Sequence, residues 1–437
     1  MEYFEVTGGP QLSGEIVPQG AKNEALQILA AVLLTDQTVT ISNLPDILDV
    51  NRMIDLLDRL GVDVEQTGEG KYKFRAENVN IDYLLTPEAH QLMSKLRGSV
   101  MIMGPLLARF GAVYVSKPGG DKIGRRRIDV HLKGMADLGA EFKFDPKNNF
   151  FSLHSPDRLT GTYMLLEEAS VTGTANILMA ATLAKGTTTI YNAACEPYLQ
   201  QLARMLQRMG AKIEGVGSNL LTIEGVENLG GTTHRLNADM IEVGSFIGLA
   251  AMTASKITIK NADVDELGLI PSTFRKLGIQ IDRSGNDLIV DGRAVCEIMT
   301  YMDGGILTLY DNTWPGLTPD LLSVLLVVAT QCRGTVLIHQ KMFESRLFFV
   351  DKLIDMGANI ILCDPHRATV IGQAREFPLR GISMTSPDIR AGVALLLAAL
   401  SADGTSKIYN IEQIDRGYQN IEGRLQALGA GVVRKVE

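Results

Sequence analysis

One phrase recurs six times along the chain: a helical run that ends in Leu-Gly or Met-Gly, followed by a segment in which apolar and polar residues alternate. A glycine just past the last helical turn supplies the left-handed conformation that caps a helix. Alternation is typical of a strand with one solvent-exposed face. The spacing predicts six α/β units of roughly 70 residues each, with glycines at Gly61, Gly139, Gly210, Gly278, Gly357 and Gly429.

A second phrase keeps step with the first and consists of an Ala- and Leu-rich helix, a short turn and a strand. These helices are apolar around most of their circumference, so we expect them to be buried. One unit alone buries too little apolar surface, and neighbouring units must therefore pack around shared helices. The six copies begin near Ala30, Met103, Met179, Leu249, Val328 and Ala398.

Six units exceed what one hydrophobic core comfortably holds, whereas three plus three give two similar lobes. We predict an α/β protein in which residues 22–236 form the first lobe, and residues 1–21 with 237–437 form the second. Residues 1–21 are expected to form a strand pair that joins the last unit. Ligands favour the clefts between lobes, so the active site is expected there.

The overall charge disfavours two classes of partner. A net charge of −8 repels nucleic acid and anionic membranes. An aromatic content of 6% is low for a protein that stacks on single-stranded nucleic acid. The expected partners are therefore small molecules, and an anionic one must be held by a local cluster of cations.

Cysteine and histidine usage indicates neither a disulfide framework nor a metal site, and no cofactor is expected. The N-terminal residues lack the basic and apolar regions of an export signal. The longest apolar stretches, near 321–329 and 391–402, are too short to cross a membrane. We expect a cytoplasmic protein. The four cysteines and six histidines are Cys195, Cys296, Cys332, Cys363, His90, His131, His154, His234, His339 and His366.

Residues 117–127, KPGGDKIGRRR, concentrate glycine and positive charge in an otherwise acidic chain. A solvated basic turn or a nucleic-acid patch would account for them. A loop that closes over an anionic substrate explains the mixture better, because glycine permits closure and arginine grips phosphate through two hydrogen bonds. Lys22, beside a predicted helix start, could seat a phosphate or be a solvated surface lysine.

Asp320 and three arginines of the fifth and sixth units, which stand at equivalent repeat edges, form a further set of candidates. Asp320 precedes an apolar helix and could either cap it or act as a general base. Arg346, Arg390 and Arg416 could each form an ordinary surface ion pair. Their matching positions in the repeat favour convergence on one site.

These residues lie in motifs that resemble those of the UDP-N-acetylglucosamine enolpyruvyl transferases (1-carboxyvinyltransferases). The resemblance runs from Val6 to Gly429. It implies a two-lobed inside-out α/β barrel of βαβαββ-type units, three in each lobe. It also implies transfer of the enolpyruvyl group of phosphoenolpyruvate to the 3-hydroxyl of UDP-N-acetylglucosamine in peptidoglycan synthesis, without a cofactor. The motifs are GAKNEAL (20–26), KLRGSV (95–100), PGGDKIGRRRIDVHL (118–132), LTPD (317–320), FESR (343–346), PDIRAG (387–392) and IDRGYQNIE (414–422).

The resemblance also implies roles for matched residues. Asp320 would take the proton from the sugar hydroxyl, Asp121 would donate one, and Asp388 would sit beside C3 of the enol. The arginines of the last two units would hold the phosphate and carboxylate of phosphoenolpyruvate, with Lys22 and Asn23 nearby. The implied sugar-nucleotide contacts are Arg97, Arg126, Ile128, Asp129, His131, Ser170, Val171 and Met342.

The chain departs from the family pattern at three places. Asp121 replaces a cysteine that the epoxide antibiotic fosfomycin alkylates in most members, so we predict resistance to fosfomycin. Glu168 replaces a lysine that binds the diphosphate, which leaves Arg125 or Arg127 to supply the positive charge. Leu-Thr-Pro-Asp (317–320) replaces Phe-Pro-Thr-Asp ahead of the base.

Two rival functions stay open at this stage. A shikimate 3-phosphate enolpyruvyl transferase would share the fold, but it has no use for the GRRRIDVH motif at 124–131. A binding protein that kept the fold and lost catalysis is suggested by the departures at Asp121 and Glu168.

Overall fold

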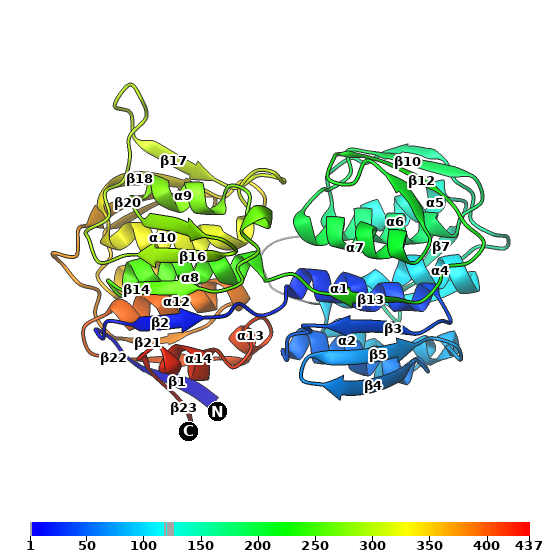
Figure 1. Cartoon of the computed structure of the whole chain (residues 1–437), viewed down its shortest axis with the longest axis horizontal. Helices are drawn as coiled ribbons and strands as arrows, with labels where there is room; N and C mark the ends of the chain where they lie inside the picture. Colours follow the sequence, from blue (N-terminus) through cyan, green and yellow to red (C-terminus); the bar gives the residue numbers. More distant parts are fainter. Residues whose placement is uncertain (1, 118, 120–125) are drawn as a thin grey trace. The chain divides into compact units, whose positions relative to one another are not determined.

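A computed structural model of the chain describes residues 2–117, 119 and 126–437, and these residues divide into two compact units (Figure 1). Unit 1 contains the residues up to Gln19 and Ala238–Glu437. Unit 2 contains the described residues from Gly20 to Asn237. The chain therefore passes from one unit to the other after Gln19 and again after Asn237.

The described residues of unit 2 form three sheets. Their strand orders are β13-β3-β5-β4, β6-β8-β7 and β11-β12-β10-β9. The strands are β3 (Val39–Ser42), β4 (Asp63–Gly68), β5 (Lys71–Arg75), β6 (Ala112–Ser116), β7 (Glu141–Asp145), β8 (Phe150–His154), β9 (Tyr163–Leu165), β10 (Thr187–Tyr191), β11 (Lys212–Glu214), β12 (Leu220–Glu224) and β13 (Thr232–Arg235).

Unit 1 likewise has three sheets in its described residues. Their orders are β21-β22-β1-β23, β15-β16-β14-β2 and β17-β18-β20-β19. The strands are β1 (Glu2–Thr7), β2 (Ser13–Ile16), β14 (Lys256–Ile259), β15 (Gln280–Ser284), β16 (Asp287–Asp291), β17 (Leu307–Tyr310), β18 (Arg333–His339), β19 (Ile360–Asp364), β20 (Arg367–Gln373), β21 (Ser383–Thr385), β22 (Thr405–Tyr409) and β23 (Gly431–Val436). Six small sheets, three in each unit, confirm the predicted α/β fold of six repeats.

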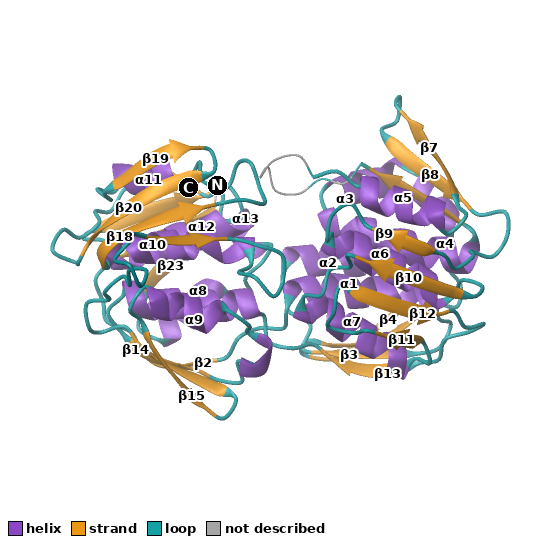
Figure 2. Cartoon of the chain, turned by 90° about the horizontal axis from the view of Figure 1, so that it is seen from above, coloured by secondary structure: helices purple, strands orange, loops and turns teal. Residues whose placement is uncertain are grey.

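Helices fill the inside of each unit, and the sheets lie around them (Figure 2). The helices of unit 2 are α1 (Lys22–Ala31), α2 (Leu48–Arg59), α3 (Pro87–Ser94), α4 (Met103–Phe110), α5 (Asp129–Asp137), α6 (Val171–Thr182) and α7 (Pro197–Arg208). Those of unit 1 are α8 (Met240–Met252), α9 (Ile270–Lys276), α10 (Leu322–Gln331), α11 (Val350–Asp355), α12 (Ile389–Ser401), α13 (Glu412–Asp415) and α14 (Ile421–Ala427). Short 3-10 turns are η1 (Val32–Leu34), η2 (Ile81–Leu85), η3 (Arg97–Ile102), η4 (Val264–Glu266) and η5 (Pro319–Leu321).

The six repeated glycines behave as the sequence predicts. Each follows the last turn of a helix and takes a left-handed backbone conformation, with φ between 88° and 106°. A side chain would strain the backbone at such an angle. The glycine therefore lets each helix stop and turn directly into the next strand.

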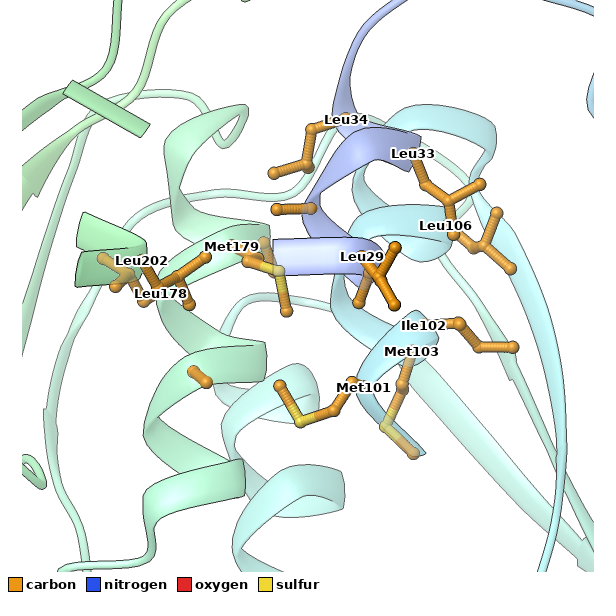
Figure 3. Close-up of a cluster of buried hydrophobic side chains, with 14 of the residues drawn as sticks. Leu29, Leu33, Leu34, Met101, Ile102, Met103, Leu106, Leu178, Met179 and Leu202 are labelled. Carbon is orange, nitrogen blue, oxygen red and sulfur yellow. The ribbon is translucent and has the colours of Figure 1, made fainter. Parts of the chain in front are cut away.

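The Ala- and Leu-rich helices are buried, as expected. Every residue of α8 and of α10 is buried, and these two helices pack against α12 in unit 1. Unit 2 has an equivalent core, in which α4 packs on α6 and α1 packs on α7. Figure 3 shows part of it, with Leu29, Leu33, Leu106 and Leu178 pointing into one apolar cluster. Among the described helices, none is long and apolar enough to cross a membrane.

The N-terminal strands differ in part from the prediction. β1 joins the last unit, since it pairs antiparallel with both β22 and β23. β2 instead pairs parallel with β14, in another sheet. The prediction that these two strands pair with each other is therefore wrong. They belong to different sheets, and they connect the N-terminal segment to two repeats of unit 1.

Candidate functional site

Three charged side chains meet in unit 1 and are called here the arginine cluster: Asp320, Arg346 and Arg390. The Nη2 atom of Arg346 lies 2.6 Å from Oδ1 of Asp320. The Nε atom of Arg390 lies 3.3 Å from the other carboxylate oxygen. Both arginines are less than 10% exposed. Each oxygen of the Asp320 carboxylate therefore contacts one largely buried guanidinium group.

Asp320 reaches this cluster from the short turn η5. The sequence suggested that Asp320 could cap the following helix, and this alternative is wrong. The N-cap residue of that helix, α10, is Leu321, and no side chain caps it. Thr318 is the N-cap residue of η5, and its hydroxyl accepts a hydrogen bond from the backbone N–H of Asp320 at 3.4 Å. The Asp320 carboxylate instead contacts the two arginines.

The N-terminus of α12 positions Arg390. Asp388 caps this helix, and its Oδ1 accepts hydrogen bonds from the backbone N–H groups of Arg390 at 2.7 Å and Ala391 at 3.0 Å. A carboxylate is a favourable N-cap because it meets unpaired N–H groups and the positive end of the helix dipole. Arg416 is also buried. It directly follows the neighbouring turn α13, and its Nη1 donates to Gln413 at 2.8 Å.

Asp311 organises the loop that leads to Arg346. It is fully buried at the end of β17, and its carboxylate accepts hydrogen bonds from the Gln340 side chain and from the backbone N–H groups of Lys341 and Met342. Burial raises the pKa of Asp311, and the two backbone donors oppose that rise. β17 and β18 run parallel, so this carboxylate joins the ends of neighbouring strands. Met342 itself is 40% exposed.

The arginine cluster has more positive than negative charge. Burial disfavours the charged guanidinium of Arg390, but the Asp320 carboxylate and the Tyr418 hydroxyl raise its pKa above the ordinary value. The buried Nε atom of Arg346 has no hydrogen-bond partner among the described residues. Buried hydrogen-bond donors in folded proteins normally have an acceptor, so a bound ligand is expected to supply one here. The arrangement therefore suits a small anion with several oxygens.

Unit 2 contains a second set of candidate residues, beginning at α1. Lys22 starts this helix, and its ammonium group lies 2.7 Å from Oδ2 of Asp49. Gly20 precedes it, where a Cβ atom would lie 1.8 Å from the carbonyl oxygen of Asn43. Only glycine fits this close approach, which explains the Gly-Ala-Lys-Asn motif locally. Asn23 is half-buried on the same first turn.

A pocket of about 620 Å³ lies in unit 2 beside the start of α5. This volume falls in the range of small-molecule sites. Arg97 donates to the backbone carbonyl of Arg127 at 3.2 Å. Burial and the nearby Arg126 lower the pKa of Arg97 to about 10. The pocket is thus lined by both basic and apolar side chains. The lining residues are Arg97, Lys117, Arg126, Arg127, Ile128, Asp129, Leu132, Lys133, Ala136, Phe142 and Phe151.

His131 lies behind this pocket and is only 1% exposed. The side-chain oxygen of Asn176 accepts from Gly104 N–H at 2.8 Å, so its amide nitrogen must donate to Nδ1 of His131 at 2.9 Å. The ring proton is then on Nε2, which donates to the Thr172 hydroxyl at 3.0 Å. Burial and Arg97 lower the pKa of His131 to about 3, so the ring is neutral. Both ring nitrogens are occupied within the protein.

The first turn of α6 carries the remaining candidates. Ser170 is its N-cap and accepts a hydrogen bond from Gly173 N–H at 3.3 Å, and Val171 is the first helical residue. The exposed Glu168 precedes them. The free N–H groups of a helix start favour an anion. Asp121, Lys122 and Arg125, which belong to the predicted glycine-rich loop at 117–128, lie outside the described residues.

Comparisons with known proteins test the resemblance. The family described as EPSP synthase (3-phosphoshikimate 1-carboxyvinyltransferase) matches residues 6–425. UDP-N-acetylglucosamine 1-carboxyvinyltransferase from Bacteroides thetaiotaomicron is 65% identical over 99% of this chain and 100% of its own length. This chain belongs to the enolpyruvyl transferase family. The relative of the same name from Porphyromonas gingivalis is 62% identical over the same share of both chains.

Solved structures support the fold of this enolpyruvyl transferase independently. The enolpyruvyl transferase NikO from Streptomyces tendae superimposes with a TM-score of 0.86 at 21% identity, covering 100% of this chain and 99% of that one. EPSP synthase from Acinetobacter baumannii gives a TM-score of 0.75 at 15% identity over the full length of both chains. At such low identity the likeness shows that the enolpyruvyl transferase fold is shared.

Three residues around the site of this enolpyruvyl transferase escaped the sequence analysis. Asp49 pairs with Lys22, Asp311 holds the Met342 loop, and Tyr418 contacts Arg390. Asp311 directly follows β17, and a charged residue at the end of an apolar strand is a signal that could have identified it. Asp49 lies within an ordinary amphipathic helix, where no pattern distinguishes it.

Proposed function

We infer that this chain transfers the enolpyruvyl group of phosphoenolpyruvate to the 3-hydroxyl of UDP-N-acetylglucosamine and releases phosphate. This is the first committed step of peptidoglycan synthesis. The observation that carries the inference is 65% identity, along essentially the whole chain, to a UDP-N-acetylglucosamine 1-carboxyvinyltransferase. Both substrates are phosphorylated metabolites that do not cross membranes unaided, so the reaction is proposed to take place in the cytoplasm.

The reaction is an addition followed by an elimination. C3 of phosphoenolpyruvate gains a proton while the sugar 3-hydroxyl loses its own and attacks C2. The tetrahedral intermediate then expels phosphate, and a proton leaves C3 to restore the double bond. No electrons are exchanged with another molecule, so the steps need only acid–base groups and stabilisation of negative charge.

The arginine cluster is proposed to bind phosphoenolpyruvate together with Arg416. Phosphoenolpyruvate brings about three negative charges, and preorganised guanidinium groups stabilise the carboxylate and the departing phosphate without rearranging. Arg346 supports this role, because its buried Nε atom has no acceptor in the described part of the chain. Asp320 is proposed to be the base that takes the proton from the sugar hydroxyl. Asp388 would border C3 of the enol from its position at the start of α12.

The candidates in unit 2 are proposed to bind the sugar nucleotide. Its basic and apolar pocket fits a nucleotide, which combines an anionic diphosphate with a flat ring. Arg97, Arg126, Ile128 and Asp129 line that pocket. The helix start at Ser170 and Val171 would face the diphosphate. His131 supports this site from behind, since both of its ring nitrogens are occupied.

Three further residues have proposed roles at the reacting atoms. Lys22 and Asn23, on the first turn of α1, would meet phosphoenolpyruvate and the sugar. Met342 would border the sugar through its backbone. Asp121 is proposed as the proton donor to C3, on its position in the motif alone.

A phosphate-release assay tests the function. The purified protein is incubated with phosphoenolpyruvate plus either UDP-N-acetylglucosamine or shikimate 3-phosphate. We expect release with the UDP-sugar only. Release with shikimate 3-phosphate alone would identify the other branch of the family, and release with neither would indicate a binding protein.

A further inference from the structure

Arg390 has a second partner, which the roles proposed so far leave unused. Its Nη1 atom donates a hydrogen bond to the hydroxyl of Tyr418 at 3.3 Å. Tyr418 is only 1% exposed and ranks among the largest fully buried side chains of the described residues. A buried tyrosine hydroxyl normally has a partner for both its proton and its lone pairs, so its surroundings reveal which way each bond runs.

The proton positions around Tyr418 follow from Ser245. The hydroxyl of Ser245 lies 2.9 Å from the carbonyl oxygen of Ile241, to which it can only donate. Its single proton is therefore used, and it must accept the hydrogen bond that joins it to Tyr418 at 3.0 Å. The Tyr418 proton is then used as well. A lone pair of Tyr418 faces Arg390, which can only donate. The bonds form one directed chain from Arg390 through Tyr418 and Ser245 to the backbone of α8.

This chain gives Arg390 an acceptor that carries no charge. Burial raises the pKa of Tyr418, although the nearby Arg390 lowers it, and the phenol stays neutral. Arg390 already has one carboxylate partner, Asp320. A second carboxylate in the place of Tyr418 would add further negative charge, whereas a phenol oxygen fixes one N–H group of the guanidinium and adds none. The Arg390 side chain is 6% exposed, so it has little water to orient it otherwise.

We propose that Tyr418, backed by Ser245, is a positioning residue that aims the Arg390 guanidinium at the anion of the substrate. This inference rests on the proposed function, in which Arg390 binds phosphoenolpyruvate. Without the Tyr418 hydroxyl, Arg390 keeps Asp320 as an ionic partner and turns toward it. The anion site then loses a correctly oriented donor.

The test compares Tyr418→Phe with Tyr409→Phe. The first substitution keeps the buried ring and removes only the hydroxyl. The second removes a hydroxyl that contacts Glu437 at the surface of the same unit, 3.3 Å away. We expect Tyr418→Phe to raise the KM for phosphoenolpyruvate roughly tenfold, the range of one hydrogen bond to a charged group. The KM for UDP-N-acetylglucosamine should stay within twofold, and Tyr409→Phe should change neither. Thermal unfolding verifies that both variants are folded.

A double-variant cycle separates positioning from simple packing. Ser245→Ala should shift the same KM in the same direction, and combining it with Tyr418→Phe should add little, because the two hydroxyls act in series. Equal shifts in both KM values, an unchanged KM for phosphoenolpyruvate, or fully additive effects would overturn the proposal. Calorimetric binding of phosphoenolpyruvate provides the same comparison without turnover. If the proposed function is wrong, the unmodified chain will show no turnover. This result is distinguishable from a failure of the positioning role proposed for Tyr418 and Ser245.

Discussion

The ammonium group of Lys22 lies 2.7 Å from the carboxylate of Asp49, and both side chains are less than 10% exposed. The pair joins the first turn of α1 to the first turn of α2, and thereby fixes the Gly-Ala-Lys-Asn motif at the start of unit 2. Arg52, one turn later on α2, approaches the same carboxylate at 3.7 Å. Removing the carboxylate would take away the negative charge that contacts the buried Lys22 ammonium and the nearby Arg52 guanidinium.

Asp49→Asn should therefore lower the free energy of unfolding by roughly 3 kcal/mol, the usual cost of breaking a buried ion pair from one side. Urea titration measures this. The matched control is Asp55→Asn on the same helix, where the Asp55–Arg59 pair is exposed to solvent and its loss should change stability little. Equal effects at the two sites would show that burial of the Lys22 pair contributes nothing.

Asp320→Asn tests the proposed base. The amide retains the shape of the carboxylate but cannot take a proton, so kcat should fall by roughly 100-fold or more. The KM for phosphoenolpyruvate should not rise, because Arg346 and Arg390 lose an internal competitor for the substrate anion. Full turnover by Asp320→Ala would remove Asp320 from the mechanism.

The presence of Asp121 predicts resistance to fosfomycin. A carboxylate is a poor nucleophile toward an epoxide compared with a thiolate, so an equimolar dose should leave the activity of the purified enzyme unchanged. Asp121→Cys should become sensitive over minutes of incubation, with dialysis failing to restore activity. Complete inactivation of the unmodified chain would contradict the expectation.

Buried histidines predict acid sensitivity of unit 2. Burial, with Arg97 nearby, lowers the pKa of His131 to about 3, and burial beside Arg208 lowers that of His234 to about 4. The unfolded chain binds these protons near pH 6.5 and the folded chain does not, so stability is lost as the pH falls below 6.5. Each histidine should contribute up to about 1.4 kcal/mol per pH unit between pH 6 and 5.

Urea unfolding at pH 6 and pH 5 measures that slope. His131→Asn should reduce it, even though the variant is less stable at both pH values. His154, which is exposed on β8, provides the control, and His154→Asn should leave the slope unchanged. An identical slope for His131→Asn and the unmodified chain would mean that His131 takes up a proton as readily folded as unfolded.

The repeats were predictable because their signals are local. A glycine that must be left-handed, such as Gly278, stands directly after the helix it ends, and the strand pattern follows at once. Pairings between distant residues were not predictable. Nothing near Tyr418 reveals that its hydroxyl meets Ser245, 173 positions earlier, because that contact exists only once α8 and the segment between α13 and α14 have come together in the fold.

The error at Asp320 shows how a distant contact outweighs a local rule. Asp is a strong N-cap residue, and Thr318 two positions earlier is another. Sequence alone does not rank them, since the deciding factor is the pair of arginines, Arg346 and Arg390, that the fold brings to the Asp320 carboxylate. In the folded chain Thr318 takes the backbone N–H and Asp320 takes the guanidinium groups.

The pairing of β1 also bears on how the protein is made. Tyr3 lies opposite Tyr409, and Glu2 lies opposite Val436. Phe4 and Val6 leave the ribosome long before the strands that pair with β1, because β22 and β23 lie about 400 residues later in the sequence. Unit 2 can complete all of its described sheets in the meantime, since its last strand, β13, ends at Arg235. Until residues 405–436 have been made, β1 has neither of its partner strands, and an unpaired strand edge of this kind is prone to misassembly and a substrate for chaperones.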